Sequence, residues 1–392
     1  MVTWHLYAGR RGTRLLADGL HAYMGTAVNF NEKPFIVIWE TTQACDLACV
    51  HCRAWAEPRT HPLELSTLEA HGLIDQVASI GVPVFVLTGG DPMKRPDIFD
   101  LIEYATGHGV RTSMTPSATP LLTRKAITDL KSRGLARMAL SLDCSRAELH
   151  DEFRGVAGSF GRTLAAVGWA REEGLPIQIN TTISRRNLRD FDALVKVIEG
   201  LDPVLWSVFF LVPTGRGRVS DMITAEEFEQ VFARLYALEK TAPFDIKTTE
   251  APHFRRFVLQ RRAAERRNGT SGRVQPVVSP SNGRITLDGI GRAPRGINDA
   301  KGFVFVSHLG EVMPSGFLPI SGGNIRRRPL LDIYQNSPLF VSLRDTSLLK
   351  GKCGVCEFRE VCGGSRARAY AITGDELAEE PFCIHQPATA VQ

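Results

Sequence analysis

The stretch PFIVIWETTQACDLACVHCRAW, residues 34–55, joins an apolar run to three closely spaced cysteines. Residues 35–39 are apolar and partly β-branched, which predicts a short buried strand over residues 35–40. Cys45, Cys49 and Cys52 follow it directly in a CxxxCxxC arrangement. In parallel α/β barrels, the loops that follow the strands build the active site. We therefore expect these cysteines at the active-site end of such a sheet.

Similar apolar runs recur along the chain, separated by longer amphipathic stretches. Strands are predicted over residues 35–40, 83–87, 111–115, 137–142, 176–183 and 205–211. Helices are predicted over residues 67–80, 97–108, 123–133, 160–173 and 188–199. This alternation is typical of βα units around a parallel sheet. Because six units are too few for a complete eight-unit barrel, the expected fold is α/β, an open partial (βα)6 TIM-like barrel.

The length of 392 residues, with 43% hydrophobic residues, exceeds the usual size of one domain. A helical extension is expected over residues 1–34, with an amphipathic helix at 10–23. The partial barrel is expected over residues 35–240, a basic linker over 241–300, and a small C-terminal α+β iron–sulfur domain over 301–392. That last domain opens with the alternation of a β-hairpin, which is predicted to turn at Leu309 and Gly310.

The charge balance is mildly basic, since 47 Lys and Arg against 42 Asp and Glu give +5. Such a balance does not indicate nucleic acid as a partner. No apolar run approaches the roughly 18 residues of a membrane span, and the first residues lack the pattern of a signal peptide. We therefore expect a cytoplasmic protein that binds neither a membrane nor nucleic acid.

Seven of the eight cysteines fall into two tight groups that have the spacing of metal ligands. In the first group, three thiolates can hold three irons of a cubane cluster and leave the fourth iron free to bind a small molecule. A zinc site of these cysteines with His51 is the alternative, but zinc motifs usually pair one CxxC with a distant second pair. His51 is expected to pack beside the cluster. Cys144 lies apart from both groups and is expected to be a buried, inert thiol.

The second group lies in the tail and consists of Cys353, Cys356, Cys362 and Cys383. Four thiolates can saturate one cubane cluster or one tetrahedral zinc ion. The spacing alone does not decide between the two metals.

The first cysteine group, with Asp46 and Leu47 between its members, resembles the cluster motif of the radical S-adenosylmethionine (SAM) superfamily. TGGDP at residues 88–92 resembles the family's Gly-Gly-Glu-Pro element, with an aspartate where glutamate is commoner. Either carboxylate accepts hydrogen bonds. Further family-like positions follow in the expected order on later strands. The resemblance implies SAM contacts at Gly89, Gly90, Asp91, Pro92, Ser141, Asp143, Arg154, Asn180 and Gly215.

The tail resembles the SPASM domain that follows many radical SAM cores, in the part that binds the outer auxiliary cluster. This implies a second 4Fe–4S cluster on the four tail cysteines. Arg366 stands where the full pattern has a further cysteine, and the segment around Met313 lacks another, so no inner auxiliary cluster is expected. With four protein ligands, the cluster would transfer electrons or stabilise the fold.

Membership of this family implies that SAM binds the open iron, accepts an electron from a donor such as ferredoxin or flavodoxin, and yields a 5′-deoxyadenosyl radical. The tail is similar to that of enzymes that alter porphyrin side chains, and also to that of ribosomal-peptide maturases. A tetrapyrrole-like substrate with carboxylates is favoured, and a peptide is the alternative. A non-catalytic iron–sulfur electron carrier is the rival class, but it would not need the TGGDP element. Arginines are candidate partners for substrate carboxylates, unless they form an exposed basic helix face: Arg255, Arg256, Arg261, Arg262, Arg266, Arg267, Arg366 and Arg368.

Overall fold

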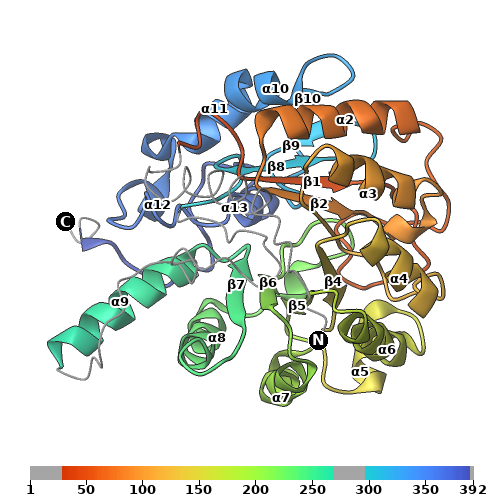
Figure 1. The fold of residues 1–392 in the computed structure, drawn as a ribbon. Coiled ribbons are helices and arrows are strands. Elements are labelled where there is room, and N and C mark those ends of the chain that lie inside the picture. The colour runs from red at the N-terminus through yellow and green to blue at the C-terminus, as the bar shows by residue number, and fades with distance from the viewer. Residues whose placement is uncertain (1–28, 269–295, 389–392) are drawn as a thin grey trace, which may run out of the picture.

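A single twisted sheet organises the molecule in the computed structural model, which describes residues 29–268 and 296–388. Its ten strands lie in the order β10-β9-β8-β1-β2-β3-β4-β5-β6-β7 (Figure 1). All neighbours from β8 to β7 in this order are parallel, whereas β9 pairs antiparallel with β8 and β10. The strands are β1 (Ile36–Glu40), β2 (Val84–Thr88), β3 (Thr112–Met114), β4 (Arg137–Ser141), β5 (Ile177–Ile183), β6 (Leu205–Phe210), β7 (Asp245–Thr249), β8 (Phe303–Val306), β9 (Glu311–Met313) and β10 (Gly323–Asn324).

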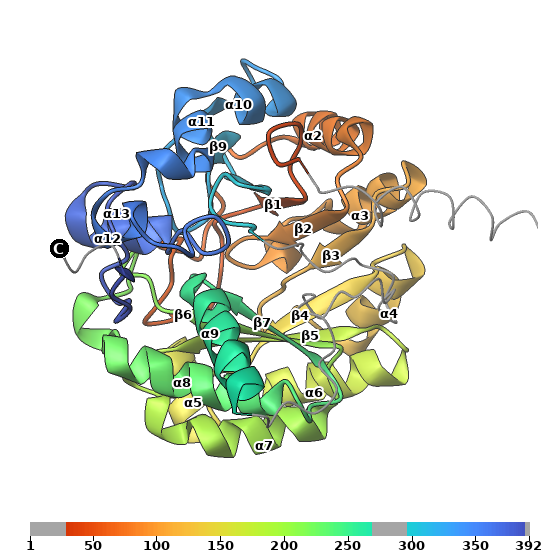
Figure 2. The same ribbon diagram turned by 90° about the vertical axis from the view of Figure 1, so that its left-hand side faces the viewer.

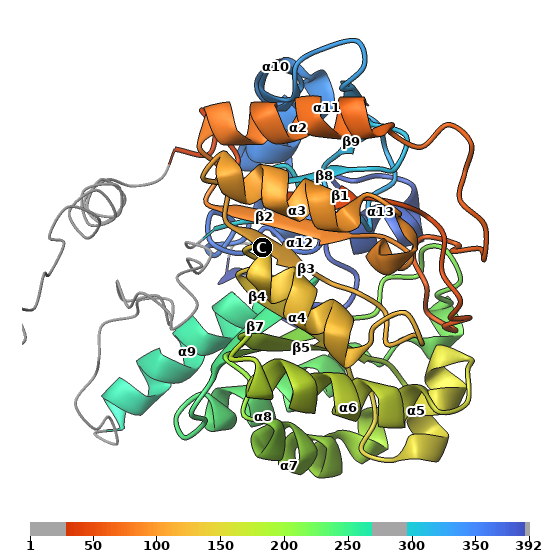
Figure 3. The same ribbon diagram turned by 45° about the vertical axis from the view of Figure 1, so that its right-hand side comes forward.

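Helices cover the outer face of the parallel strands, as Figures 1 and 3 show for the segment from α2 to α8. The tail helices lie beside β8 and β9, and α10 and α11 stand next to α2 (Figure 2). The α-helices are α2 (Thr67–Ile80), α3 (Ile98–Gly107), α4 (Arg124–Ser132), α5 (Ala147–Arg154), α6 (Ser159–Glu172), α7 (Phe191–Leu201), α8 (Ala225–Leu238), α9 (His253–Arg267), α10 (Leu330–Asn336), α11 (Pro338–Arg344), α12 (Gly351–Gly354) and α13 (Arg366–Thr373). Short 3-10 turns occupy Pro92–Lys94, Leu188–Asp190, Val219–Asp221 and Thr346–Leu348.

The alternation of side chains along β5 shows how the sheet separates core from cavity. Ile177, Ile179 and Ile183 are buried in the main core, whereas Asn180 and Thr182 are half-buried on the opposite face. Successive side chains of a strand point to opposite faces, so one face packs on helices and the other is free for polar side chains. The polar face of β5 therefore looks into the interior of the curved sheet.

The predicted strands and helices are present, and most of their ends shift by no more than two residues. The largest shift is in α7, which begins at Phe191 because a 3-10 turn occupies Leu188–Asp190. The hairpin is also confirmed, since β8 and β9 are antiparallel and Gly310 of the turn has a φ of 81°. The structure confirms the α/β class with a parallel sheet, which matches a partial TIM-like barrel.

The sheet extends beyond the six predicted parallel strands on both sides. β7 pairs in parallel with β6, and β8 pairs in parallel with β1. The arginine-rich stretch at the expected linker forms α9. The expected helix at residues 10–23 lies outside the described residues. Among the described residues, no helix combines the length and the apolarity of a membrane span.

Candidate active site

A cavity lies at the carboxyl ends of the parallel strands. It encloses about 1090 Å³, counting the part that opens to solvent. Its walls come from the cysteine loop after β1, the ends of β2 to β6, and Phe317 after β9. Ligand sites in parallel α/β folds lie at this end of the strands.

The three loop cysteines all line this cavity, as the sequence predicts for a shared metal site. Cys45 receives a hydrogen bond from the backbone N–H of Leu47, at 3.4 Å, and lies 3.4 Å from the hydroxyl of Ser117. Arg154 donates to the sulfur of Cys49 at 3.7 Å. Burial raises the pKa of Cys45 to about 11, and burial also raises the pKa of Cys49. A bound metal ion would ionise these thiols, and the surrounding donors suit thiolate sulfur, so the residues fit an iron–sulfur cluster.

Arg216 ties the cysteine loop to the loop that follows β6. Its side chain donates to the carbonyl of Cys49 at 2.9 Å and to that of Ala56 at 3.2 Å. Gly215 precedes it with a φ of 58°, and a Cβ there would collide with the carbonyl of Cys52. Gly215, expected to contact SAM, thus packs against the cysteine loop and does not line the cavity.

The TGGDP turn after β2 lies directly against the cysteine loop. Gly89 and Gly90 line the cavity, and a Cβ on either would collide with a carbonyl of that loop, Thr42 for Gly89 and Ala44 for Gly90. This close approach of backbone to backbone explains the two glycines. The turn therefore presents backbone groups to the cavity beside the cysteines.

Asp91 lies behind this turn and is completely buried. Its carboxylate accepts hydrogen bonds from Thr119 Oγ1 at 2.8 Å and from the backbone N–H groups of Met93 and Ser117 at 3.1 and 3.2 Å. Burial raises the pKa of Asp91, although these hydrogen bonds oppose the shift. Pro92 is buried as well and begins the 3-10 turn Pro92–Lys94. Both residues hold the turn and do not line the cavity.

Ser141 and Asn180 are neighbours in the register of β4 and β5, and both line the cavity. Asp143, two residues after Ser141, is completely buried and pairs with Arg154. Burial raises the pKa of Asp143, while the charge of Arg154 opposes the shift. Arg154 reaches the cavity wall with its charge already compensated by this partner.

His51 also lines the cavity, and its ring packs 4.4 Å from that of Phe153. Burial and the charges of Arg154 and Arg216 hold the pKa of His51 well below its ordinary value. The ring is therefore neutral at pH 7. This neutral ring, packed on Phe153, matches the expected place beside the cluster.

Several cavity residues escaped the sequence prediction: Arg53, Thr115, Ser117, Thr182, Phe209 and Phe317. Of these residues, Arg53 is the one that the sequence could have indicated, because it directly follows Cys52, a predicted cluster ligand. The others reach the cavity through strand register and loop packing, which the sequence does not display.

The four tail cysteines line a second, smaller cavity of about 370 Å³, counted in the same way. Backbone N–H groups donate to three of the sulfurs: Gly364 to Cys362 at 3.4 Å, Phe358 to Cys356 at 3.4 Å and Glu380 to Cys353 at 3.3 Å. Burial raises the pKa of Cys362 to about 12. The cations Arg256 and Lys352 line the same cavity and, with the N–H donors, suit thiolate sulfur once a metal ion has ionised the thiols.

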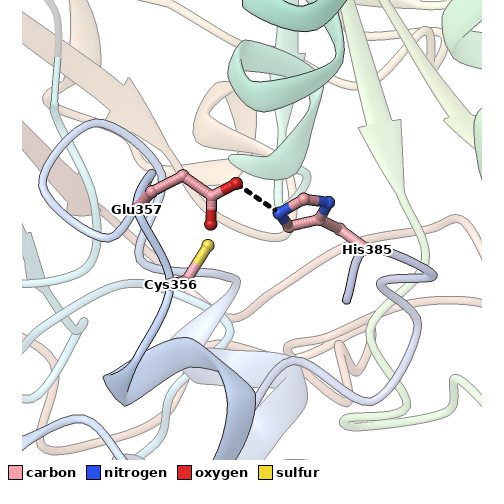
Figure 4. A group of neighbouring side chains, drawn as sticks. All are labelled: Cys356, Glu357 and His385. Atoms are coloured by element: carbon pink, nitrogen blue, oxygen red, sulfur yellow. Dashed lines mark hydrogen bonds and ion pairs between the residues drawn. The ribbon is translucent and has the colours of Figure 1, made fainter. Parts of the chain in front are cut away.

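Figure 4 shows Cys356 beside Glu357 and His385 in this tail region. One ligand atom from each of the three lies within 4.8 Å of the other two, and His385 Nε2 is 3.0 Å from a carboxylate oxygen of Glu357. Cys356 belongs to both groups, and His385 also lines the cavity of the four cysteines, so the trio adjoins that cavity.

In the tail, the arginines that are candidate partners for substrate carboxylates bind other groups of the protein instead. Arg366 is 1% exposed and donates to the carbonyls of Glu376 and Ala378, while Arg368 is fully buried and pairs with Glu380 at 3.0 Å. In α9, Arg255 and Arg256 bind protein carbonyls and Glu229. The alternative of an exposed basic face holds only for Arg261, Arg266 and Arg267 of α9, because Arg262 is half-buried and its charge acts on Glu239.

Comparison with known proteins decides the family. A profile of the radical SAM superfamily matches residues 39–198, which span the cysteine loop and the walls of the cavity from β1 to β5. The chain belongs to the radical SAM superfamily. It is therefore an enzyme, and membership implies a 4Fe–4S cluster and SAM. Cys144, buried and 1% exposed, stays apart from both cysteine sites.

Relatives match nearly the whole chain. The AdoMet-dependent heme synthase of Methanosarcina barkeri is 42% identical over 90% of this chain and 97% of its own. The Fe-coproporphyrin III synthase of the same organism is 32% identical over 90% and 88%, and the PqqA peptide cyclase of Bradyrhizobium diazoefficiens is 27% identical over 90% and 87%. SuiB of Streptococcus suis bound to S-adenosylmethionine shares the fold with a TM-score of 0.67 at 16% identity, covering 97% of this chain and 84% of SuiB.

Proposed function

We propose that this radical SAM enzyme modifies the side chains of a tetrapyrrole, by decarboxylation in haem-type cofactor biosynthesis. The observation that carries the proposal is the 42% identity to an AdoMet-dependent heme synthase over 97% of that protein's length. The cavity lies directly beside the three cysteines, where a substrate would meet SAM bound at the cluster.

In this proposal Cys45, Cys49 and Cys52 hold the catalytic cluster. When bound, the cluster and SAM supply a 5′-deoxyadenosyl radical that removes a hydrogen atom from the substrate. The backbone at Gly89 and Gly90 holds the methionine part, and Ser141 with Asn180 holds the rest of the cofactor across β4 and β5. Arg154 donates to a cluster sulfur, while Asp143 keeps that arginine in place. The surrounding wall keeps competing hydrogen donors, including water, away from the reacting carbon.

For a propionate side chain, conversion of its carboxylate form to a vinyl group releases CO₂, a hydrogen atom and one electron. We assign a second 4Fe–4S cluster to Cys353, Cys356, Cys362 and Cys383, supported by the N–H donors and cations around their sulfurs. Such a cluster would supply the one-electron acceptor that the reaction needs. A low-potential donor of the ferredoxin or flavodoxin type would reduce the first site. The cytoplasm suits the eight unpaired cysteines.

A peptide maturase is the second candidate, favoured by the relationship to PqqA peptide cyclase. One experiment separates the two. The reconstituted enzyme is incubated anaerobically with SAM, a reductant and an iron porphyrin that carries a propionate on every ring, and products are analysed by mass spectrometry. Loss of CO₂ and two hydrogens from individual side chains supports the proposal. Formation of 5′-deoxyadenosine with an unchanged porphyrin would overturn it in favour of another substrate.

A further inference from the structure

Arg53 lies in the wall of the active-site cavity, and its charge has no role in the proposed binding of the cluster or of SAM. It directly follows Cys52 and lines the cavity, as Phe317 and Phe209 do. Among the described residues, two arginines line this cavity, and the other, Arg154, is paired with the buried Asp143. Arg53 is therefore the remaining candidate for an anion at this wall.

Glu40 binds Arg53 directly, and His308 binds Glu40. Glu40 ends β1 and is 4% exposed, and its Oε1 accepts from Nη1 of Arg53 at 3.2 Å. The other carboxylate oxygen lies 2.6 Å from Nδ1 of His308, which follows β8. Burial raises the pKa of Glu40, but the charge of Arg53 and the hydrogen bond from His308 outweigh it and hold that pKa below its ordinary value. Glu40 is thus ionised and fixes the guanidinium at one corner.

The guanidinium also lies in a fitted slot. Its central carbon is 4.5 Å from the centre of the Phe305 ring. Gly316 lies beside both groups, because a Cβ added there would come within 3.0 Å of the Phe305 ring and within 3.1 Å of Cζ and of Nε of Arg53. The Gly316 carbonyl accepts a long hydrogen bond from Nη1 at 3.5 Å. An aromatic ring and a close backbone leave the side chain little freedom, so its position is set before any ligand binds.

Both protein acceptors of Arg53 use the same nitrogen, Nη1. Within the described parts of the chain, Nε and Nη2 have no hydrogen-bond partner. These two nitrogens form one edge of the guanidinium, and this edge presents two parallel N–H groups that match the two oxygens of a carboxylate. The side chain is 18% exposed and lines the cavity, where an anion could approach it.

The place of Arg53 in the sheet separates it from the polar residues assigned to SAM on β4 and β5. Its partners belong to β1, β8 and the turn after β9, whereas Asn180 lies on β5. Four strand-to-strand steps separate β1 from β5, which corresponds to about 19 Å along the sheet. Arg53 is thus held by a part of the sheet that carries neither of the polar residues assigned to SAM on β4 and β5.

We propose that Arg53 binds a carboxylate of the substrate and so orients it beside the cluster, with Glu40 and His308 as positioning residues. The inference rests on the proposed function, and it names a propionate chain of the tetrapyrrole as the group bound. The reacting carbon then lies on a side chain other than the one held. A charged bidentate contact of this kind is expected to change affinity about 10- to 100-fold.

The test measures dissociation constants by absorbance titration of the reconstituted holoenzyme with SAM and without reductant. The probes are the iron porphyrin with free propionates and the same porphyrin as its methyl ester. The variants are Arg53→Gln, Gly316→Ala, which crowds the guanidinium while keeping its charge, and Arg59→Gln as a matched control at an exposed arginine of the same loop. Iron content and SAM affinity are measured for each variant to show that the fold and cofactor site are intact.

Wild type and Arg59→Gln should prefer the free acid about 10- to 100-fold, and Arg53→Gln should bind acid and ester alike. Gly316→Ala should lose part of the preference. The inference is wrong if Arg53→Gln keeps the full preference, or if it weakens SAM binding instead. If neither porphyrin binds wild type but a carboxylate-bearing peptide does so in an Arg53-dependent manner, the tetrapyrrole assignment fails while the carboxylate site stands.

Discussion

Replacement of Arg368 by methionine should strongly destabilise the protein, because this arginine fastens the tail to the barrel. It is fully buried, pairs with Glu380 at 3.0 Å, and donates to the carbonyls of Glu250 and Phe210 at 2.6 and 3.3 Å. Glu380 is also buried and would remain as an uncompensated charge. Removal of one partner of a buried ion pair costs about 3–5 kcal/mol, and the loss is expected in this range.

The assay is urea unfolding of the holoprotein, with Arg327→Met as the control at an exposed arginine. In wild type, burial raises the pKa of Glu380, but Arg368 and His253 lower it below its ordinary value. Without Arg368 that pKa rises, so the folded variant takes up a proton and its deficit shrinks as the pH falls. The double variant Arg368→Met/Glu380→Leu should recover at least about 1 kcal/mol. A deficit below about 1 kcal/mol for the single variant would refute the reasoning.

Three further outcomes are expected. Gly90→Ala should abolish SAM cleavage, because the added Cβ collides with the cysteine loop. The control Gly168→Ala, whose Cβ meets open space, should keep the wild-type product yield. An active Gly90→Ala enzyme would contradict this. Burial raises the pKa of Glu239 to about 7, above its unfolded value of 4.5. Glu239→Gln should therefore be more stable than wild type near pH 8 in urea titrations, and this gain should disappear below about pH 4, where the carboxyl is protonated in both the folded and the unfolded protein. An equal gain at both pH values would contradict this. The variant that lacks all three loop cysteines should still bind about four irons, and zinc in their place would exclude the auxiliary cluster.

The core of the fold was predictable from the sequence because its strands are continuous apolar runs. Residues 36–40 and 205–210 are buried on both faces at most positions, and this gives a strong signal for parallel strands. β7 escaped prediction because DIKTT contains one apolar residue, and Ile246 alone is buried in it. Its strand conformation comes from pairing with β6, which a local pattern does not reveal.

The residues of the candidate site were likewise predictable only in part. Cysteine spacing and the TGGDP turn identified the residues beside the cavity, because ligands and tight backbone contacts need fixed residue types. The roles of charged residues were harder to assign. Arg366 and Arg368 looked available for a substrate, but their partners are carbonyls and Glu380, which only the folded chain brings together. Arg53 could not be recognised without Glu40, Phe305 and Gly316 around it.

The most direct test of the account is the yield of 5′-deoxyadenosine from anaerobically reconstituted protein given SAM and a reductant. Wild type should form it, and Cys49→Ala should form none because the cluster loses a ligand. Cys144→Ala, a control at a buried cysteine outside both sites, should match wild type. Equal yields from Cys49→Ala and wild type would contradict the assignment of the catalytic cluster to this loop.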